Sequence, residues 1–257
     1  MYQEHYDALF SMDFMDTKYP HVDTMKALGI FDVELGLKNM HLAKFFSYHM
    51  ESYKELTSGI LFGFNYGEGT KWNFKEKELQ RVWATIADGV YSSSRSKAAQ
   101  IRSPVLRYVH KALANTFFAR KATGTINEGE LKFLDMGIKP ILSRTSDGKR
   151  IRGDRSDTGN LMPFLDHSYL QDHSLTTLGI NEGRRLSVGG LITPILCAAG
   201  VNPTDKRATE PGWMDIKFCK TNLLIEHKEL DGRFQFKFTH PLVGPSKFSC
   251  LTQSSPQ

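Results

Sequence analysis

Cysteine is scarce in this chain of 257 residues. Its three cysteines, Cys197, Cys219 and Cys250, stand far apart from one another, and no C-x-x-C pair occurs. The spacing therefore supports neither a structural zinc site nor a disulfide framework. Free thiols are typical of a reducing compartment. Cys197 lies in an apolar stretch, so we expect a buried and inert thiol there.

Long apolar runs are also missing. The longest stretch without a charge is Leu186–Thr204, and glycines, prolines and polar groups interrupt it repeatedly. Such a composition argues against a membrane-spanning helix. The segment Met1–Asp16 mixes acidic and aromatic side chains and lacks the basic start of a secretory signal. We therefore expect an intracellular protein, in the nucleus or the cytoplasm.

Motifs for catalysis and cofactor binding are largely absent. The glycines near residues 63–69 have the wrong spacing for a phosphate loop or a dinucleotide fingerprint. Neither a G-x-S-x-G nucleophile elbow nor an H-E-x-x-H zinc motif occurs. The sequence thus predicts no cofactor, no metal, no catalytic residue and no small-molecule substrate.

Two weaker constellations leave an enzyme open as the alternative. His167, Asp172 and His173 form the densest imidazole–carboxylate cluster, which a hydrolase or a metal-dependent enzyme would use. Their spacing fits no metal template, and a polar helix face is the simpler interpretation. Asp157-Thr158-Gly159 has the letters of an aspartic protease loop, but polar residues flank it where apolar strands are required.

Positive charge is concentrated in the middle of the chain. Residues 1–94 carry 9 basic and 13 acidic side chains, residues 95–155 carry 14 and 5, and residues 156–257 carry 10 of each. The three balances, −4, +9 and 0, give the net charge of +5. A basic block of this kind attracts nucleic acid by releasing counterions from phosphates. A solvated surface with no ligand is the other interpretation.

Apolar residues at spacings of three and four predict a mainly helical chain. The clearest helix follows Ser103, an N-cap residue, with Pro104 in its first turn. Its buried face is expected to contain Leu106, Val109, Leu113 and Phe117. Arg107 and Lys111, one turn apart, are expected on the exposed face.

Other segments give further local predictions. Ser47 is expected to cap a helix with Met50, Tyr53, Leu56 and Ile60 on its apolar face. The alternation in residues 60–66 predicts one strand. Asn73 begins a second helix, and Asn127 with Glu130 begins a third that runs toward Gly137. The apolar face of the second helix is Leu79, Val82, Trp83, Ile86 and Val90.

The last third of the chain predicts a short helix and a hairpin. Gly189 and Gly190 indicate closely packed backbone, and the apolar helix after them is kinked by Pro194 or begins at Thr193. Asp231-Gly232 is a turn dipeptide favoured in hairpins, flanked by two extended runs. A two-residue loop pairs Glu229 with Phe234 and His227 with Phe236.

These predictions define the fold class as α+β, mainly α. We expect a helical domain with one short N-terminal strand region and a C-terminal β-hairpin. Residues 1–142 form a mainly helical region and residues 143–160 a flexible basic loop or linker. Residues 161–257 contain a helical segment and the hairpin, packed as one domain with the first region.

Several motifs resemble a plant retroelement family. They are Met25–Ile30, Tyr53–Thr57, Ile101–His110, Leu113–Arg120, Thr123–Leu131, Val188–Ile195, Phe238–Pro241 and Gly244–Ser246. In this order they resemble the C-terminal domain of the first-open-reading-frame protein of Athila-type, gypsy-class LTR retrotransposons. The resemblance extends from about residue 20 to residue 250. Between Tyr66 and Trp83 the family carries a longer stretch, which is shortened here.

The resemblance implies a Gag-like, non-enzymatic protein of uncharacterised biochemical role. It supplies no catalytic residues, and the zinc knuckle usual in Gag proteins is absent. The expected partners are retroelement RNA or DNA and further copies of the chain, without a membrane. The shortened segment leaves a decayed, non-functional fragment as another alternative.

Nucleic-acid binding, if present, is predicted to use the basic block. The candidate contacts are Arg95, Lys97, Arg102, Arg107, Lys111, Arg150, Arg152 and Arg155. Serine hydroxyls beside them are donors for phosphates but do not read bases, so binding is expected to tolerate any sequence. Tyr108 is the aromatic residue nearest these cations, with core packing as its alternative role.

Overall fold

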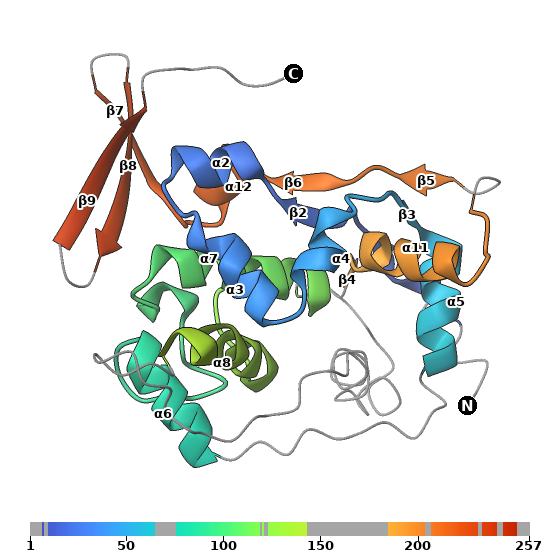
Figure 1. The fold of residues 1–257 in the computed structure, drawn as a ribbon, viewed down its shortest axis with the longest axis horizontal. Helices are drawn as coiled ribbons and strands as arrows, with labels where there is room; N and C mark the ends of the chain where they lie inside the picture. The colour runs from blue at the N-terminus through green and yellow to red at the C-terminus, as the bar shows by residue number, and fades with distance from the viewer. Residues whose placement is uncertain are drawn as a thin grey trace.

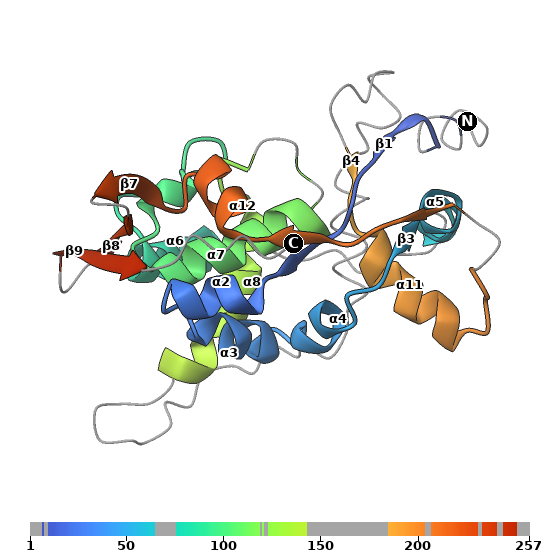
Figure 2. The ribbon, with the colours of Figure 1, turned by 90° about the horizontal axis from the view of Figure 1, so that it is seen from above.

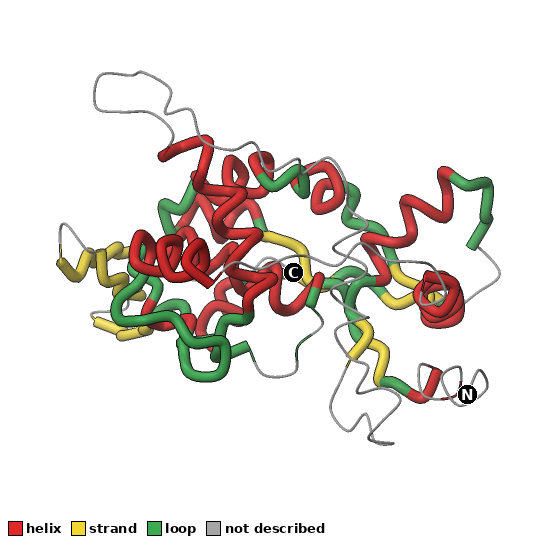
Figure 3. The backbone as a smooth tube through the Cα atoms, turned by 90° about the horizontal axis from the view of Figure 1, so that it is seen from below, coloured by secondary structure: helices red, strands yellow, loops and turns green. Residues whose placement is uncertain are grey.

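A computed structural model describes residues 7, 10–64, 76–118, 120, 123–142, 185–203, 207–230, 233–240 and 244–250. Helices dominate this part of the chain, and its strands are short (Figures 1 and 3). The α+β, mainly α class is therefore confirmed. The linker expected at 143–160 lies outside the described residues, so the division into three regions stays a prediction.

The elements follow one another along the chain as shown in Figure 1. The helices are α2 (Val22–Ala27), α3 (Asp32–Asn39), α4 (Ala43–Ser47), α5 (Lys54–Phe64), α6 (Glu76–Ile86), α7 (Pro104–Ala112), α8 (Glu128–Leu142), α11 (Gly189–Ala198) and α12 (Ile216–Thr221). A 3-10 turn, η1 (Ala98–Gln100), precedes α7, and a π-helical turn, η2 (Leu113–Phe117), extends it. The strands are β1 (Asp13–Phe14), β2 (Lys18–Pro20), β3 (Ser52–Tyr53), β4 (Arg185–Leu186), β5 (Ala208–Thr209), β6 (Gly212–Met214), β7 (Glu226–Leu230), β8 (Arg233–His240) and β9 (Gly244–Cys250).

Strands from the two ends of the chain pair with each other (Figure 2). β1 pairs with β4 and β2 with β6, both in parallel, and β3 pairs with β5 in antiparallel orientation. Each of these pairs is very short, too short to be stable without the surrounding side chains. Together they join the segment 13–53 to the segment 185–214.

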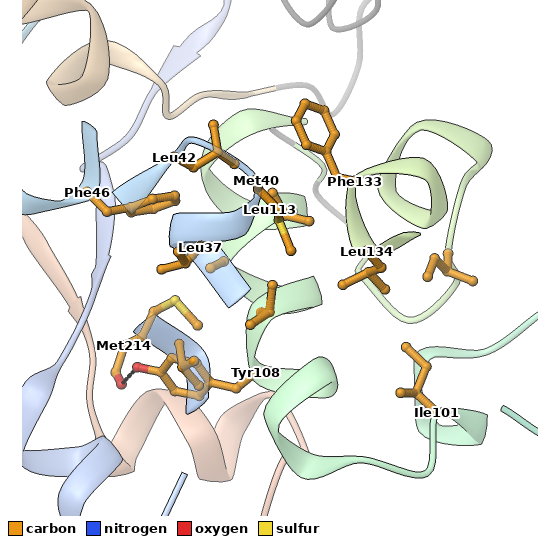
Figure 4. Packing of buried hydrophobic residues seen from close by; sticks show 14 of the residues in the cluster. Leu37, Met40, Leu42, Phe46, Ile101, Tyr108, Leu113, Phe133, Leu134 and Met214 are labelled. Carbon is orange, nitrogen blue, oxygen red and sulfur yellow. Dashed lines mark hydrogen bonds between the residues drawn. The ribbon is translucent and has the colours of Figure 1, made fainter. Parts of the chain in front are cut away.

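Helices α3, α7 and α8 pack against one another and form the centre of the hydrophobic core (Figure 4). Leu113 and Leu134 are fully buried there, and Leu37 of α3 is 4% exposed. Tyr108 of α7 is 1% exposed, and its hydroxyl donates to the carbonyl oxygen of Met214 at 2.8 Å. The core interpretation of Tyr108 is therefore confirmed.

The predicted apolar face of α7 and η2 is confirmed at its centre. Val109 and Leu113 are fully buried, whereas Leu106, nearer the start of the helix, is half-buried. The side chain of Phe117 lies outside the described part of the structure. The spacing of three and four therefore identified the residues that face the core.

The predicted starts of the two central helices are confirmed. The Ser103 hydroxyl accepts from the N–H of Leu106 at 3.3 Å, and Pro104 opens α7. At α8 the Asn127 side chain accepts from the N–H of Glu130 at 2.7 Å, and the Glu130 carboxylate accepts from the N–H of Asn127 at 2.9 Å. Such reciprocal bonds satisfy amides that a helix leaves without partners in its first turn.

The predictions for residues 47–64 are wrong in part: Leu56 and Ile60 lie in a helix, α5, but its start and the strand after it differ from the prediction. Ser47 ends α4 instead of capping a helix, and Tyr53 lies in β3. The strand predicted at 60–66 is helical as far as Phe64, within α5. Ile60 and Phe64 are also four residues apart, and Leu61 and Phe64 three, so the same apolar residues fit a helix as well as a strand. The N-terminal strands are β1, β2 and β3.

Helix α6 matches its predicted apolar face except at one end. Leu79, Val82, Trp83 and Ile86 are buried, whereas Val90 is 81% exposed. The helix ends at Ile86, and Gly89 takes a φ of +83° after it. The chain therefore leaves the helical path before Val90. The expected start at Asn73 lies outside the described residues.

Helix α11 begins at Gly189, so the predicted start at Thr193 is wrong and Pro194 lies within the helix. Both glycines are needed because a side chain at either position would collide with neighbouring atoms. A Cβ atom on Gly189 would stand 2.6 Å from Cβ of Ser52, and one on Gly190 would stand 2.6 Å from the carbonyl oxygen of Met50. The close packing predicted for this pair is confirmed.

Cys197, predicted to be buried, is exposed near the end of this helix.

The C-terminal hairpin has the predicted register. Glu229 pairs with Phe234, and His227 pairs with Phe236. The turn residues Asp231 and Gly232 lie outside the described residues. A third strand, β9, which the sequence did not predict, pairs with β8 in antiparallel orientation.

Replacing Leu113 by alanine tests the central core. Leu113 is fully buried at the junction of α7 and η2. We therefore expect its replacement by alanine to lower the free energy of unfolding by about 2–5 kcal/mol. Urea unfolding gives this value, and Val90→Ala, at a position 81% exposed, is the control with little expected change. An unchanged midpoint for Leu113→Ala would contradict the burial described.

Gly190→Ala tests the contact between α11 and the N-terminal strands. The added methyl group would collide with the Met50 carbonyl and the Tyr19 hydroxyl, so we expect a loss of about 1–3 kcal/mol in unfolding experiments. Gly59→Ala, where nothing lies within 4 Å of the new Cβ, is the matched control. Because Gly59 lies inside α5, that substitution should stabilise the protein slightly. Equal effects of the two substitutions would argue against the close contact.

Candidate functional site

The structure divides the predicted basic contacts into groups with different surroundings. Five of the eight lie in described parts of the chain: Arg95, Lys97, Arg102, Arg107 and Lys111. The other three, Arg150, Arg152 and Arg155, lie outside them. The enzyme candidates Asp157, His167, Asp172 and His173 also fall outside the described residues.

Arg95 and Lys97 are exposed on a well-bonded loop between α6 and η1. The loop closes on itself where the N–H groups of Arg95 and Ser96 donate to the carbonyl oxygen of Ser92, at 3.1 and 2.8 Å. The Ser96 carbonyl accepts from the N–H of Ile126 at 3.1 Å, which fixes the loop to the segment before α8. Both side chains are therefore presented to solvent from a backbone that is already ordered.

Arg102 holds the end of α6. Its guanidinium donates to the carbonyl oxygens of Ala84, Thr85 and Ala87, the last at 2.8 Å. It also contacts the carboxylate of Asp88 at 2.9 Å. The last carbonyls of a helix lack partners within the helix, and a cation there also stabilises the helix dipole. Arg102 thus has a structural role that occupies most of its donors.

Lys111, predicted to be exposed, is buried, with 7% of its surface accessible. Its ammonium donates to the carbonyl oxygen and to the hydroxyl of Thr123, at 2.8 and 2.7 Å. Thr123 therefore covers the ammonium on the side where sequence spacing suggested solvent. Burial lowers the pKa of Lys111 from 10.5 to about 8, against the opposing effect of Glu130.

A buried ionic network lies beside Lys111, and sequence analysis did not predict it. The network consists of His110, Arg120 and Glu130. The Glu130 carboxylate contacts His110 Nε2 at 3.0 Å and the Arg120 guanidinium at 2.8 Å. The same guanidinium donates to the carbonyl oxygen of Thr125 at 2.9 Å. The network therefore ties α7, α8 and the segment between them together.

The charges of this network offset the burial of its carboxylate. Burial alone would raise the pKa of Glu130, but the hydrogen bond and charge of His110, with the Arg120 guanidinium, hold that pKa below its ordinary value. His110 and Glu130 form the kind of pair that acts in acid–base catalysis. Both side chains are, however, 0% exposed, so neither reaches a dissolved substrate in this arrangement. The pair therefore links α7 to α8.

The capping signal at Asn127 and Glu130 was the one local hint of this network. It placed the glutamate at the start of α8 but gave no sign of His110 or Arg120, because those contacts join positions well separated in the sequence. No motif marks such a contact in a single sequence.

Arg107 differs from its neighbours on α7. Its side chain, predicted to be exposed, is half-buried, and its Nε atom has no hydrogen-bond partner among the described residues. Burial lowers the pKa of its guanidinium. A cation that has lost part of its water shell without gaining a carboxylate retains donors for an external anion.

The remaining site expectations concern metals and membranes. Among the described residues, no three His, Cys, Asp or Glu side chains are grouped so as to hold a metal ion. In the same part of the chain no helix is long and apolar enough to cross a bilayer.

Lys111→Met tests the environment of the buried ammonium through its pH dependence. The unfolded chain keeps this proton up to about pH 10.5, whereas the folded chain releases it near pH 8. The unfolded state therefore binds more protons between these values, and wild-type stability should rise with pH there. We expect a rise of up to about 3 kcal/mol from this group, absent in Lys111→Met.

Chemical unfolding of both proteins from pH 7 to 10 measures this difference. The exposed Lys38→Met is the control and should keep the wild-type slope. Comparison with Lys111→Met also removes the contribution of buried tyrosines such as Tyr19, whose pKa burial raises to about 12. Identical slopes for wild type and Lys111→Met would show that the ammonium is well solvated.

Comparison with known proteins identifies the family. Neither curated proteins nor solved structures gave a match. A family model described as the ATHILA ORF-1 family matches residues 1–61 and 57–255, which together span nearly the whole chain. This match agrees with the resemblance seen in the sequence motifs. The chain therefore belongs to the ATHILA ORF-1 family of retrotransposon-derived proteins.

Proposed function

We propose that the chain is a non-enzymatic, Gag-like structural protein that associates with retroelement RNA or DNA without reading its sequence. The proposal rests on the exposure and the hydrogen bonding of the cations in residues 95–111. Arg95 and Lys97 are exposed on an ordered loop, and Arg107 is partly desolvated without a described carboxylate partner. Phosphate groups are the anions that such side chains bind.

The loop of Arg95 and Lys97 suits contact with a phosphate backbone. Ser93 and Ser94 are exposed beside the two cations and add hydroxyl donors. Since the loop is fixed by its own hydrogen bonds, binding would order only the side chains, which reduces the entropic cost. Contacts of this type go to phosphates and sugars, which carry no sequence information. Binding should therefore tolerate any sequence.

Arg107 would add a stronger contact of the same kind. Guanidinium groups bind phosphates through two parallel hydrogen bonds, and partial removal of water strengthens the attraction. Lys111 and Arg102 are not part of this proposed surface because their donors are used inside the protein. The number of contacts we expect from the described residues is accordingly smaller than the sequence suggested.

A non-enzymatic role fits the described chemistry best. The His110–Glu130 pair is enclosed, and its geometry favours a structural role over catalysis. The hydrolase alternative depends on residues outside the described part and has no support from the family match. Self-association, also expected of a Gag-like protein, remains a prediction.

Paired polar groups in the core favour an intact fold over a decayed fragment. The contacts of Lys111, Arg120 and Glu130 each require particular residue types. Their presence together supports a chain that folds despite the shortening expected between Tyr66 and Trp83.

Charge reversal in the loop tests the proposed interface. Affinity for a single-stranded RNA is measured as a function of salt for wild type and for Arg95→Glu combined with Lys97→Glu. Loss of two phosphate contacts should reduce the slope of log affinity against log salt by about 1.4 and weaken binding to every sequence alike. The variant should melt like wild type because both side chains are exposed.

Lys38→Glu combined with Lys44→Glu is the matched control. It changes the net charge by the same amount at exposed positions on α3 and α4. We expect a smaller loss of affinity for this pair. An equal loss would mean that the total charge of the chain, and not this loop, determines binding, and a salt-independent affinity would contradict the interface altogether.

A further inference from the structure

Four aromatic rings lie close together where β6 pairs with β2. None of them belongs to the loop that carries Arg95 and Lys97. Trp213 contacts Tyr19, His21 and His49, with ring centroids 6.1, 5.8 and 4.9 Å apart. Tyr19 and His49 also meet edge to face at 5.2 Å. These separations lie in the range in which aromatic rings attract one another. We call these four residues the aromatic cluster.

Backbone contacts fix three of the rings. The Tyr19 hydroxyl donates to the carbonyl oxygen of Met50 at 3.1 Å, and His21 Nδ1 accepts from the N–H of Thr24 at 3.3 Å as the N-cap of α2. Trp213 is positioned by its strand, since Tyr19 and Trp213 are register partners in the β2–β6 pair. The rings of Tyr19 and His21 are therefore fixed by hydrogen bonds, and the backbone of Trp213 is fixed by strand pairing.

His49 is held in an uncommon conformation. Its φ of +47° lies in the left-handed region, which is unfavourable for residues other than glycine and is enriched at binding sites. This conformation brings the imidazole onto Trp213 from the loop after α4. Partial burial lowers the pKa of the His49 imidazole below its ordinary value, which favours the neutral ring.

The cluster is open on one side. Tyr19 is fully buried and forms its floor, whereas Trp213 is 39% exposed and His49 is exposed. The neighbours of Trp213 in the strand, Gly212 and Met214, are buried. An ordered, partly exposed indole beside a neutral imidazole offers a flat apolar surface to a flat ligand.

We propose that Trp213 and His49 form a stacking platform for an unpaired nucleobase. This inference rests on the proposed association with nucleic acid and names the form of the partner, a single strand. Bases in a duplex are stacked on one another and are not free to stack on a protein ring, whereas every unpaired base exposes a π face. The platform would thus add affinity for single strands without sequence preference.

The experiment compares two single-stranded oligomers of equal length and charge. One is an oligouridylate of about 20 nucleotides, and the other has the same backbone without bases. We expect wild type to bind the oligouridylate more tightly. Trp213→Ala should weaken binding to the oligouridylate by about 5- to 150-fold and leave the abasic oligomer unchanged. Trp213→Phe, which retains a ring, should recover most of the loss.

Charge reversal at Arg95 and Lys97 should weaken binding to both oligomers. This difference separates the two proposals. If wild type binds neither oligomer, the proposed function fails and the platform fails with it. If wild type binds both oligomers equally and Trp213→Ala behaves like wild type, only the platform is wrong.

Tryptophan fluorescence gives a readout that does not depend on the alanine variant folding. Of the three tryptophans, Trp83 is fully buried and Trp213 is accessible, whereas Trp72 lies outside the described residues, so the signal of Trp213 is taken as the difference between wild type and Trp213→Phe. The oligouridylate should quench wild-type emission more than the abasic oligomer does, and Trp213→Phe should remove the difference. Equal quenching of wild type and Trp213→Phe by the oligouridylate would overturn the platform.

Discussion

The second half of α7 and its π-helical extension are buried although they carry polar and charged side chains. Burial of such groups is unfavourable unless each finds a hydrogen-bond partner inside the protein. The hydroxyl of Tyr108 therefore binds Met214, the imidazole of His110 binds Glu130, and the ammonium of Lys111 binds Thr123. Thr116 donates to the carbonyl oxygen of Lys18 at 2.8 Å. Through these partners one helix connects β2, β6, α8 and the segment before α8.

The need for internal hydrogen-bond partners also determines which cations of residues 95–155 are available to a ligand. A count of charges in the sequence treats every cation as available to a ligand. In the structure, however, Arg102 binds the carboxylate of Asp88, and Lys111 binds the carbonyl oxygen of Thr123. Removing either side chain would leave carbonyl oxygens without these donors, which is destabilising. Charge-reversal variants at these positions would therefore lower stability, and a change in binding would not report on the interface alone. Arg95 and Lys97 are free of this complication because their side chains project into solvent.

Local signals predicted the elements whose causes are local. The caps at Ser103 and Asn127 fixed the starts of α7 and α8, and Asp231-Gly232 gave the register of the hairpin. The strands β1 to β6 were not predicted as such, because each is very short and pairs with a segment from the opposite end of the chain. The exposure of Lys111 was predicted wrongly for a similar reason. Helical spacing shows which residues share a face but not which segment later covers that face.

Those long-range pairs also bear on the two-part family match. The first part ends at residue 61 and the second begins at residue 57, within α5. β1, β2 and β3 belong to the first part, and their partners β4, β6 and β5 belong to the second. Gly189 and Gly190 of the second part press against Ser52 and Met50 of the first. Neither part can therefore form these strand pairs alone.

The aromatic cluster is likewise built from both parts, since Tyr19, His21 and His49 come from the first part and Trp213 from the second. A shortening next to the junction could leave this surface intact because the contacts that build it lie outside the shortened segment.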